Sequence, residues 1–167
     1  MKKILSLTLA LAMLGTALTG CGSKTAAPET SVEPTQQTAP YQQEQSQTEK
    51  ALALINTFAT GDTDTARSLL SDGYIQHNLA YGTGADAFIG SVEYLASADV
   101  KTTVNNIRAF EDGDKVFLQT IYNFAGAGEQ VAFDIFRFDE DGKIAEHWDV
   151  METIAEQSTW QNQNGKF

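Results

Sequence analysis

Apolar residues recur at intervals of three and four in three parts of the chain, and this spacing predicts amphipathic helices. The three segments are 45–59, 63–70 and 85–97. Gly61 ends the first helix and Gly84 precedes the third, as expected for residues at helix boundaries. Between the second and third helices, a Ser-Asp-Gly turn at 71–73 and a short extended piece at 74–78 are expected.

The later part of the chain is rich in Thr, Val, Ile and aromatic residues, which favour strands. The predicted strands are 101–111, 115–125, 130–139 and 143–152. Asp-Gly or Gly-rich turns join each neighbouring pair, so the four strands are expected in hairpin order. Three helices followed by such a sheet predict an α+β domain. A bent antiparallel sheet wrapped around the helices would leave a cavity at its mouth.

The composition divides the 167-residue chain into three parts. We expect a leader at 1–21, a disordered polar tether at 22–47 and a folded domain at 48–167. The formal net charge of −11 argues against a nucleic-acid partner, because such binding depends on clustered Lys and Arg. The single cysteine excludes an internal disulfide and any Cys-rich metal site.

The leader has the features of an export signal. Lys2 and Lys3 precede an apolar run at 4–18, which is short for a membrane span of roughly 20 residues. The Leu-Thr-Gly-Cys sequence that follows resembles a bacterial lipobox. The resemblance implies that Cys21 becomes the first residue and carries lipid, which would anchor the protein to a cell membrane, facing outside the cytoplasm. The alternative is an ordinary signal peptide with a chance cysteine.

Side-chain alternation on the last two predicted strands brings several polar residues together. Asp134 and Phe136 share one face of their strand, and His147 and Asp149 share one face of the next. Because the turn at 139–142 makes these strands a hairpin, Asp134 and the His147/Asp149 pair can face the same cavity. Both faces of each strand are partly apolar, so alternation alone does not decide which face is inside.

Four short motifs carry a resemblance to a known family. They are Tyr-Ile-Gln-His-Asn at 74–78, Gly84 with Phe-Ile at 88–89, Asp-Ile-Phe-Arg at 134–137 and Gly-Lys-Ile-Ala-Glu-His-Trp-Asp-Val at 142–150. Together they resemble the SnoaL-like polyketide cyclases of the nuclear-transport-factor-2-like, or cystatin-like, superfamily. The resemblance covers roughly 45–167 and implies a cone-shaped α+β fold, with a bent antiparallel sheet around three helices and a homodimer formed through the sheet.

The resemblance also implies roles for individual residues. Asp149 falls where the cyclases have the general acid/base of an intramolecular aldol closure, and Asp134 falls on a second polar pocket residue. An Asn or His near the connection between helices falls on Asn78 or His77. The chain departs from the family pattern at Leu79, where proline is common, and in its 161–167 tail.

Such chemistry requires a base beside a carbonyl and donors that hold the enolate oxygen. A carboxylate in an apolar pocket has a raised pKa and is a better base near neutral pH. His147 or His77 would donate to the oxygen or orient the carboxylate. We expect the ligand to contact Tyr74, Asn78, Phe136 and Trp148, and expect neither a metal nor an organic cofactor. Trp148 has core or dimer packing as its alternative.

Structural alternatives remain open for the other polar residues. Asp149 could bond to the backbone or to Arg137, and Asp134 could be a structural partner of His77 or His147. His77 could lock the helices to the sheet. Two histidines and an aspartate could also form a metal-binding facial triad, although their strand spacing does not suit tetrahedral zinc.

Two functional classes therefore remain. The first is a cofactor-free cyclase, isomerase or dehydratase that acts on a small carbonyl compound. The second is an anchored, non-catalytic module that binds a small apolar ligand or a protein partner, because fold does not fix function. A vestigial pocket with a dimerising sheet is a third option.

Overall fold

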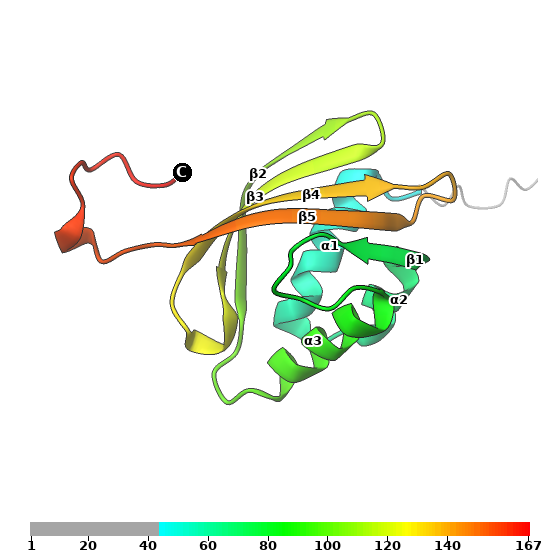
Figure 1. Ribbon diagram of the computed structural model, residues 1–167, viewed down its shortest axis with the longest axis horizontal. Helices are drawn as coiled ribbons and strands as arrows, with labels where there is room; N and C mark the ends of the chain where they lie inside the picture. The colour runs from blue at the N-terminus through cyan, green and yellow to red at the C-terminus, as the bar shows by residue number, and fades with distance from the viewer. Residues whose placement is uncertain (1–43) are drawn as a thin grey trace, which may run out of the picture. The chain divides into compact units, whose positions relative to one another are not determined.

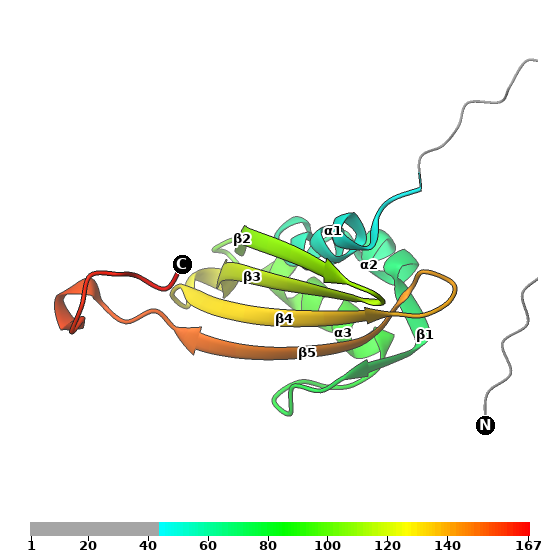
Figure 2. The ribbon, with the colours of Figure 1, turned by 90° about the horizontal axis from the view of Figure 1, so that it is seen from above.

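The computed structural model describes residues 44–167. The predicted leader and nearly all of the predicted tether lie outside the described residues. The helices are α1 (Gln47–Thr60), α2 (Thr63–Leu69) and α3 (Ala85–Ser97). The strands are β1 (Leu70–Gln76), β2 (Thr103–Asp112), β3 (Lys115–Asn123), β4 (Gln130–Phe138) and β5 (Ile144–Thr153). The fold is α+β, and the helices gather against one face of a five-stranded sheet (Figures 1 and 2).

The first helix begins and ends where its sequence signals predict. Ser46 and Glu49 form a reciprocal capping box, which satisfies two backbone N–H groups that the first turn leaves free. Gly61 ends α1 in the left-handed conformation, with φ of 74°. Leu54 and Ile55 are buried on the face of α1 that packs in the core. Periodicity and capping therefore act together to set this helix against the sheet.

The strand order is β1-β5-β4-β3-β2, and the four predicted strands pair antiparallel in hairpin order. The predicted turn at 71–73 is wrong, because these residues lie inside β1, which pairs parallel with β5. The register shifts between Leu70 and Ile75, so an irregular stretch takes up the Ser-Asp-Gly sequence. Burial of Leu70 and Tyr74 holds β1 at the sheet edge despite this local turn signal.

The third strand ends two residues earlier than its composition suggests. Phe124–Gly126 form a short 3-10 turn, in which Ala125 has a positive φ of 49°. Ala125 donates its backbone N–H to the side-chain hydroxyl of Thr102, which helps to hold this turn. The turn directs Phe124 toward Phe58 and Tyr122, so the end of the strand contributes to the interior.

The burial of individual side chains shows which face of the sheet is inside. Phe136 is fully buried with the helices and His147 is only 6% exposed, whereas Phe133 is 55% exposed and Val150 is 73% exposed. The face of β4 and β5 that carries Asp134, His147 and Asp149 is therefore the inner one. Within residues 44–167, no helix combines the length and apolar character needed to cross a membrane.

Candidate functional site

A cavity of about 510 Å³ lies between α3, the loop at 81–82 and the inner face of the sheet. This size suits a small organic ligand. Seven aromatic side chains line it: Phe58, Tyr74, Tyr81, Phe88, Tyr94, Tyr122 and Phe124. Asp134, His147 and Asp149 also line it, so an apolar chamber is combined with three ionisable groups.

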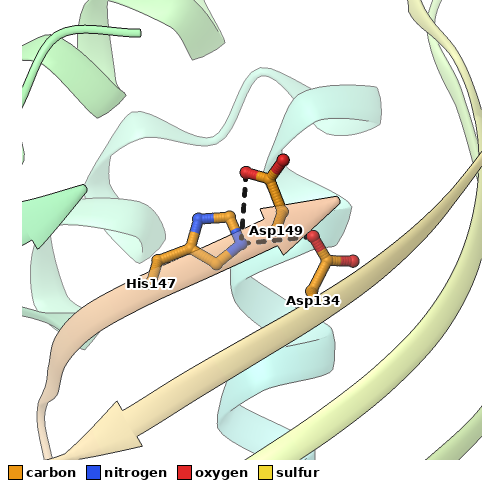
Figure 3. A group of neighbouring side chains, drawn as sticks. All are labelled: Asp134, His147 and Asp149. Atoms are coloured by element: carbon orange, nitrogen blue, oxygen red, sulfur yellow. Dashed lines mark hydrogen bonds and ion pairs between the residues drawn. The ribbon is translucent and has the colours of Figure 1, made fainter. Parts of the chain in front are cut away.

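The three ionisable side chains come from neighbouring strands in register. Asp134 lies opposite Asp149, and Phe136 lies opposite His147, in the antiparallel β4–β5 pair. His147 Nε2 is 3.2 Å from Asp134 Oδ1 and 3.9 Å from Asp149 Oδ2, so the ring points between the two carboxylates (Figure 3). All three side chains are buried. The sequence alternation therefore correctly placed these groups together.

Asp134 is held by donors from two strands. The Tyr122 hydroxyl on β3 donates to Asp134 Oδ2 at 3.0 Å, while His147 Nε2 lies within hydrogen-bond distance of Oδ1. Burial, followed by the negative charge of Asp134, raises the pKa of Tyr122 well above its ordinary value. Tyr122 therefore remains a hydrogen-bond donor, and both oxygens of Asp134 have partners that suit a carboxylate.

Asp149 has a less complete set of partners. The Asn78 side-chain amide donates to Asp149 Oδ1 at 2.5 Å. Burial raises the pKa of Asp149, and this outweighs the lowering by the Asn78 hydrogen bond and by His147, while the charge of Asp134 raises it further. Asp149 therefore takes up and releases its proton at a higher pH than an ordinary aspartate.

The first strand supplies two more residues to the site. Gln76 Nε2 lies 2.9 Å from His147 Nδ1, on the ring edge away from the carboxylates. Tyr74 forms part of the cavity wall, as expected, and burial raises its pKa well above the ordinary value, with Asp149 and Asp134 as further causes. Its hydroxyl is therefore protonated and available as a donor.

Gln76 and Tyr122 were not identified from the sequence as site residues. Gln76 is two positions after Tyr74, so alternation within the Tyr-Ile-Gln-His-Asn motif placed both on one face and could have indicated it. Tyr122 gives no comparable signal. Its contact with Asp134 depends on how β3 and β4 bend around the cavity, which a local pattern does not encode.

His77 and Trp148 lie on the outer side of the sheet, away from the Asp149 cluster. Their rings stack with centroids 4.4 Å apart and an angle of 3°. His77 Nε2 is 2.8 Å from Glu146 Oε2, and Arg137 pairs with the same carboxylate. Arg137 thus bonds to Glu146 and not to Asp149. The structure gives neither His77 nor Trp148 a place in the cavity wall.

The position of His77 follows from strand geometry. Its backbone N–H donates to the carbonyl of His147, which continues the pairing of β1 with β5. Since Gln76 faces inward, the next side chain faces outward. The structure therefore places His77 outside the cluster of Asp134, His147 and Asp149, where the predicted catalytic role and a two-histidine metal triad would require it.

Phe136 and Asn78 act on the cluster without lining the cavity. The Phe136 ring stacks on the His147 imidazole, with centroids 4.3 Å apart and an angle of 12°, and is fully buried. It thus fixes the plane of the imidazole, while Asn78 fixes one oxygen of Asp149. Both residues were expected to contact a ligand; neither is in the cavity wall, and their contacts are with His147 and Asp149.

Solved structures with this fold come from several bacteria. A protein of unknown function from Cytophaga hutchinsonii, described as NTF2-like, has a TM-score of 0.57 and 16% identity, covering 66% of this chain and 94% of that one. A candidate polyketide cyclase from Bacillus cereus has a TM-score of 0.55 and 15% identity, with coverages of 64% and 74%. An LEH-like epoxide hydrolase from M. tuberculosis has a TM-score of 0.54 and 18% identity, with coverages of 62% and 80%.

These identities are low, so the likeness shows a shared fold alone. The comparison with curated proteins gave no match. The model of the SnoaL-like domain matches residues 51–147, which is more than half of the chain. The matched region contains Asp134 and His147, and Asp149 lies just beyond its end. By this match and by its fold, the chain belongs to the SnoaL-like domain family.

Proposed function

We propose that this domain binds an uncharged carbonyl compound in its cavity, and that Asp149 moves a proton on that compound without a cofactor. The observation that carries this proposal is the state of Asp149. Its carboxyl group is buried beside an apolar chamber, one oxygen is held by Asn78, and its pKa is raised. A positioned carboxylate of this kind is a suitable general base.

The lining of the cavity supports an uncharged ligand. The wall is mainly aromatic and aliphatic, and its charged groups are the acids Asp134 and Asp149. Among the described residues, no Lys or Arg lines this cavity. An anion would therefore meet two carboxylates without a compensating charge, whereas a neutral ring system would bury apolar surface.

The proposed step begins when Asp149 Oδ2 removes a proton from a carbon beside the ligand carbonyl. The electron pair of that C–H bond is delocalised into the carbonyl group and forms an enolate. The Tyr74 hydroxyl, which lines the cavity, donates a hydrogen bond to the enolate oxygen. In an aldol closure the enolate carbon bonds to a second carbonyl carbon, and the resulting alkoxide takes the proton back from Asp149. In an isomerisation, Asp149 returns the proton to a different atom of the same ligand.

Exchange of carbon-bound hydrogen tests the proton transfer directly. Uncharged cyclic and aryl-substituted ketones in D₂O should gain deuterium faster with the protein, and Asp149→Asn should slow this exchange by about 100-fold or more. Binding of the same compounds, measured by native mass spectrometry, should change little. Glu140→Gln, which removes an exposed carboxylate far from the cavity lining, is the matched control.

A non-catalytic binding module is the second candidate, favoured by the lipobox-like Leu-Thr-Gly-Cys sequence. Polyketide cyclisation usually takes place inside the cell, whereas a lipid on Cys21 would hold the domain outside the cytoplasm. If both proteins bind the ketones equally and neither raises exchange above the buffer rate, this candidate is favoured over the enzyme.

The anchor itself is a separate proposal, supported by Lys2, Lys3, the apolar run at 4–18 and Cys21. Expression with a labelled fatty acid should label the wild-type chain in the membrane fraction. Cys21→Ser should lose the label and stay unprocessed. A label that survives this substitution would rule out Cys21 as the attachment site.

A second copy of the chain is the proposed partner for the outer face of the sheet. Phe110, Phe117, Phe133 and Val150 expose apolar surface from β2 to β5. Contiguous exposed apolar surface of this kind is typical of a protein interface. Self-association would bury this surface and leave the cavity on the opposite side accessible.

A further inference from the structure

The orientation of the Gln76 amide is fixed by a backbone group. The N–H of Asn78 donates to Gln76 Oε1 at 2.9 Å. A backbone N–H can only donate, so the oxygen of this amide must face Asn78 and the NH₂ group must face the other way. That NH₂ group lies 2.9 Å from His147 Nδ1.

This orientation determines the tautomer of His147. Since the NH₂ group of Gln76 can only donate, His147 Nδ1 must accept and therefore carries no proton. The proton of the neutral ring is then on Nε2, which points toward Asp134 Oδ1 at 3.2 Å. One line of hydrogen bonds thus runs from the Asn78 backbone through Gln76 and His147 to Asp134.

We propose that Gln76 is a positioning residue that holds His147 as the neutral Nε2–H tautomer, which makes the imidazole a fixed donor to Asp134 and leaves proton transfer to Asp149. Protonation of the ring would set Nδ1–H against the NH₂ group of Gln76, so two donors would face each other. Stacking on Phe136 prevents the ring from turning away from this contact. His147 therefore orients the Asp134 carboxylate and does not shuttle protons.

The same tautomer bears on metal binding at this cluster. Asp134, His147 and Asp149 each offer a ligand atom, and these atoms lie within 4.8 Å of one another. A histidine that binds a metal through Nε2 normally donates its other N–H to an acceptor. At His147 Nδ1, Gln76 presents a donor and not an acceptor, so His147 lacks the second hydrogen bond that a metal-binding histidine normally makes.

The two histidines of the chain make the proposal measurable by NMR. The full chain is labelled with ¹⁵N-histidine, solubilised in detergent micelles at pH 7, and assigned with His77→Gln. For His147 we expect an unprotonated, acceptor-type Nδ1 and a protonated Nε2. A protonated Nδ1 in the otherwise unaltered protein overturns the proposal.

Gln76→Glu is the informative variant because it keeps the shape and the acceptor for Asn78, but replaces the donor with an acceptor. We expect His147 Nδ1 to become protonated in this variant. Gln130→Glu adds the same charge to the cavity lining away from the ring contact, and should leave the His147 signals unchanged. An unprotonated Nδ1 in Gln76→Glu, or an equal change in Gln130→Glu, overturns the proposal.

Gln76→Met keeps the test decisive if the glutamate variant does not fold. Methionine removes both hydrogen bonds, so we expect loss of the single tautomer and signals from both neutral forms. Retention of a pure Nε2–H form would show that Gln76 does not set the tautomer.

The inference rests on the proposed function for its catalytic meaning. However, the NMR readout needs no substrate, so failure of the exchange assay and failure of the tautomer assignment are separate results.

Discussion

At the scale of the residue, Asp149 and Glu146 show how neighbouring acids on one strand acquire opposite properties. Asp149 faces inward, where burial raises its pKa. Glu146 faces outward, where hydrogen bonds from His77 and then Arg137 lower its pKa. The difference comes from the alternation of β5, which gives one acid an apolar chamber and the other two basic partners. The contributions of these two acids to the free energy of unfolding should therefore change with pH in opposite directions.

Asp149→Asn should leave the protein at least as stable as the wild type at pH 7, although it removes the proposed base. The folded state holds the Asp149 proton more tightly than the unfolded chain does. Above the ordinary value of 3.8 this group therefore makes the free energy of unfolding fall as pH rises toward its raised folded pKa. Asparagine removes that decline, and it can still accept from Asn78.

Urea denaturation of both proteins across this pH range measures the effect. The stability difference between Asp149→Asn and wild type should move in favour of the variant as pH rises. A difference that favours the wild type increasingly at higher pH would mean that the folded state stabilises the Asp149 carboxylate, and so would contradict the raised pKa.

Glu146→Gln should show the opposite dependence. The lowered pKa of Glu146 means that its stabilising contribution is present above the ordinary value of 4.5 and is lost as pH falls through the folded value. Because the carboxylate is partly exposed, we expect a loss of about 0.5–1 kcal/mol at pH 7. Thermal or urea unfolding at pH 7 and at pH 3 checks this. An equal loss at both values would point to packing and not to charge.

At the scale of the element, local signals predict the helices and hairpins well, because their causes are local. The capping box of α1 and the Asp-Gly turns act over a few residues, so the chain segment itself contains the information. In contrast, β1 pairs with β5 across about 70 residues of sequence, as in the contact between Gln76 and His147. A Ser-Asp-Gly sequence predicts a turn unless this distant pairing is known.

In the candidate site, too, local features could be predicted from the sequence and features that depend on distant pairing could not. Alternation and one hairpin bring Asp134, His147 and Asp149 together, and both are readable from sequence. The inward direction of these side chains depends on the whole core, since each strand has two partly apolar faces. His77 and Gln76 depend on the register of β1, so their sides of the sheet could not be assigned from sequence.

Gly61→Ala tests how closely the first and third helices approach. Gly61 has a positive φ of 74°, and an added Cβ would lie 2.8 Å from the Cβ of Ala96 on α3. We expect a loss of roughly 2–4 kcal/mol, because left-handed strain and overpacking both contribute. Gly113→Ala is the matched control: its φ is 62° but no atom would lie within 4 Å of the new Cβ.

Denaturant unfolding of both variants separates the two effects. Gly113→Ala should lose only about 1–2 kcal/mol from backbone strain. Equal losses in the two variants would mean that α1 and α3 move apart to accept the new methyl group at no cost in the free energy of unfolding.

At the scale of the whole molecule, the sheet separates two surfaces with different side chains. The inner face lines the aromatic cavity, while the outer face exposes Phe110, Phe117, Phe133 and Val150. The chain beyond β5 turns back to β3, where Gln119 donates to the backbone carbonyl of Lys166. The proposed homodimer would therefore form beside this returning segment and away from the cavity.

Phe133→Glu should weaken the proposed dimer, because it places a charge at the centre of the outer face in a chain that already carries a net charge of −11. Analytical ultracentrifugation should show a dimer mass for the wild type and a monomer mass for the variant. Leu79→Glu is the control, since Leu79 is fully exposed on a loop outside the sheet. A monomeric wild type at micromolar concentration, or loss of the dimer in the control, would exclude this interface.

The alternation of β5 also determines which kinds of genetic change this domain can absorb. Glu146 and Trp148 alternate with His147 and Asp149 in sequence but lie on the other side of the sheet. Inserting or deleting one codon before these positions would exchange the two sets, bringing the Glu and Trp into the chamber and sending the His and Asp to solvent. The number of residues in the 139–142 turn is therefore under a stricter constraint than their identity. A one-codon change in the length of this hairpin would therefore separate His147 and Asp149 from Asp134 and dismantle the candidate site in a single step.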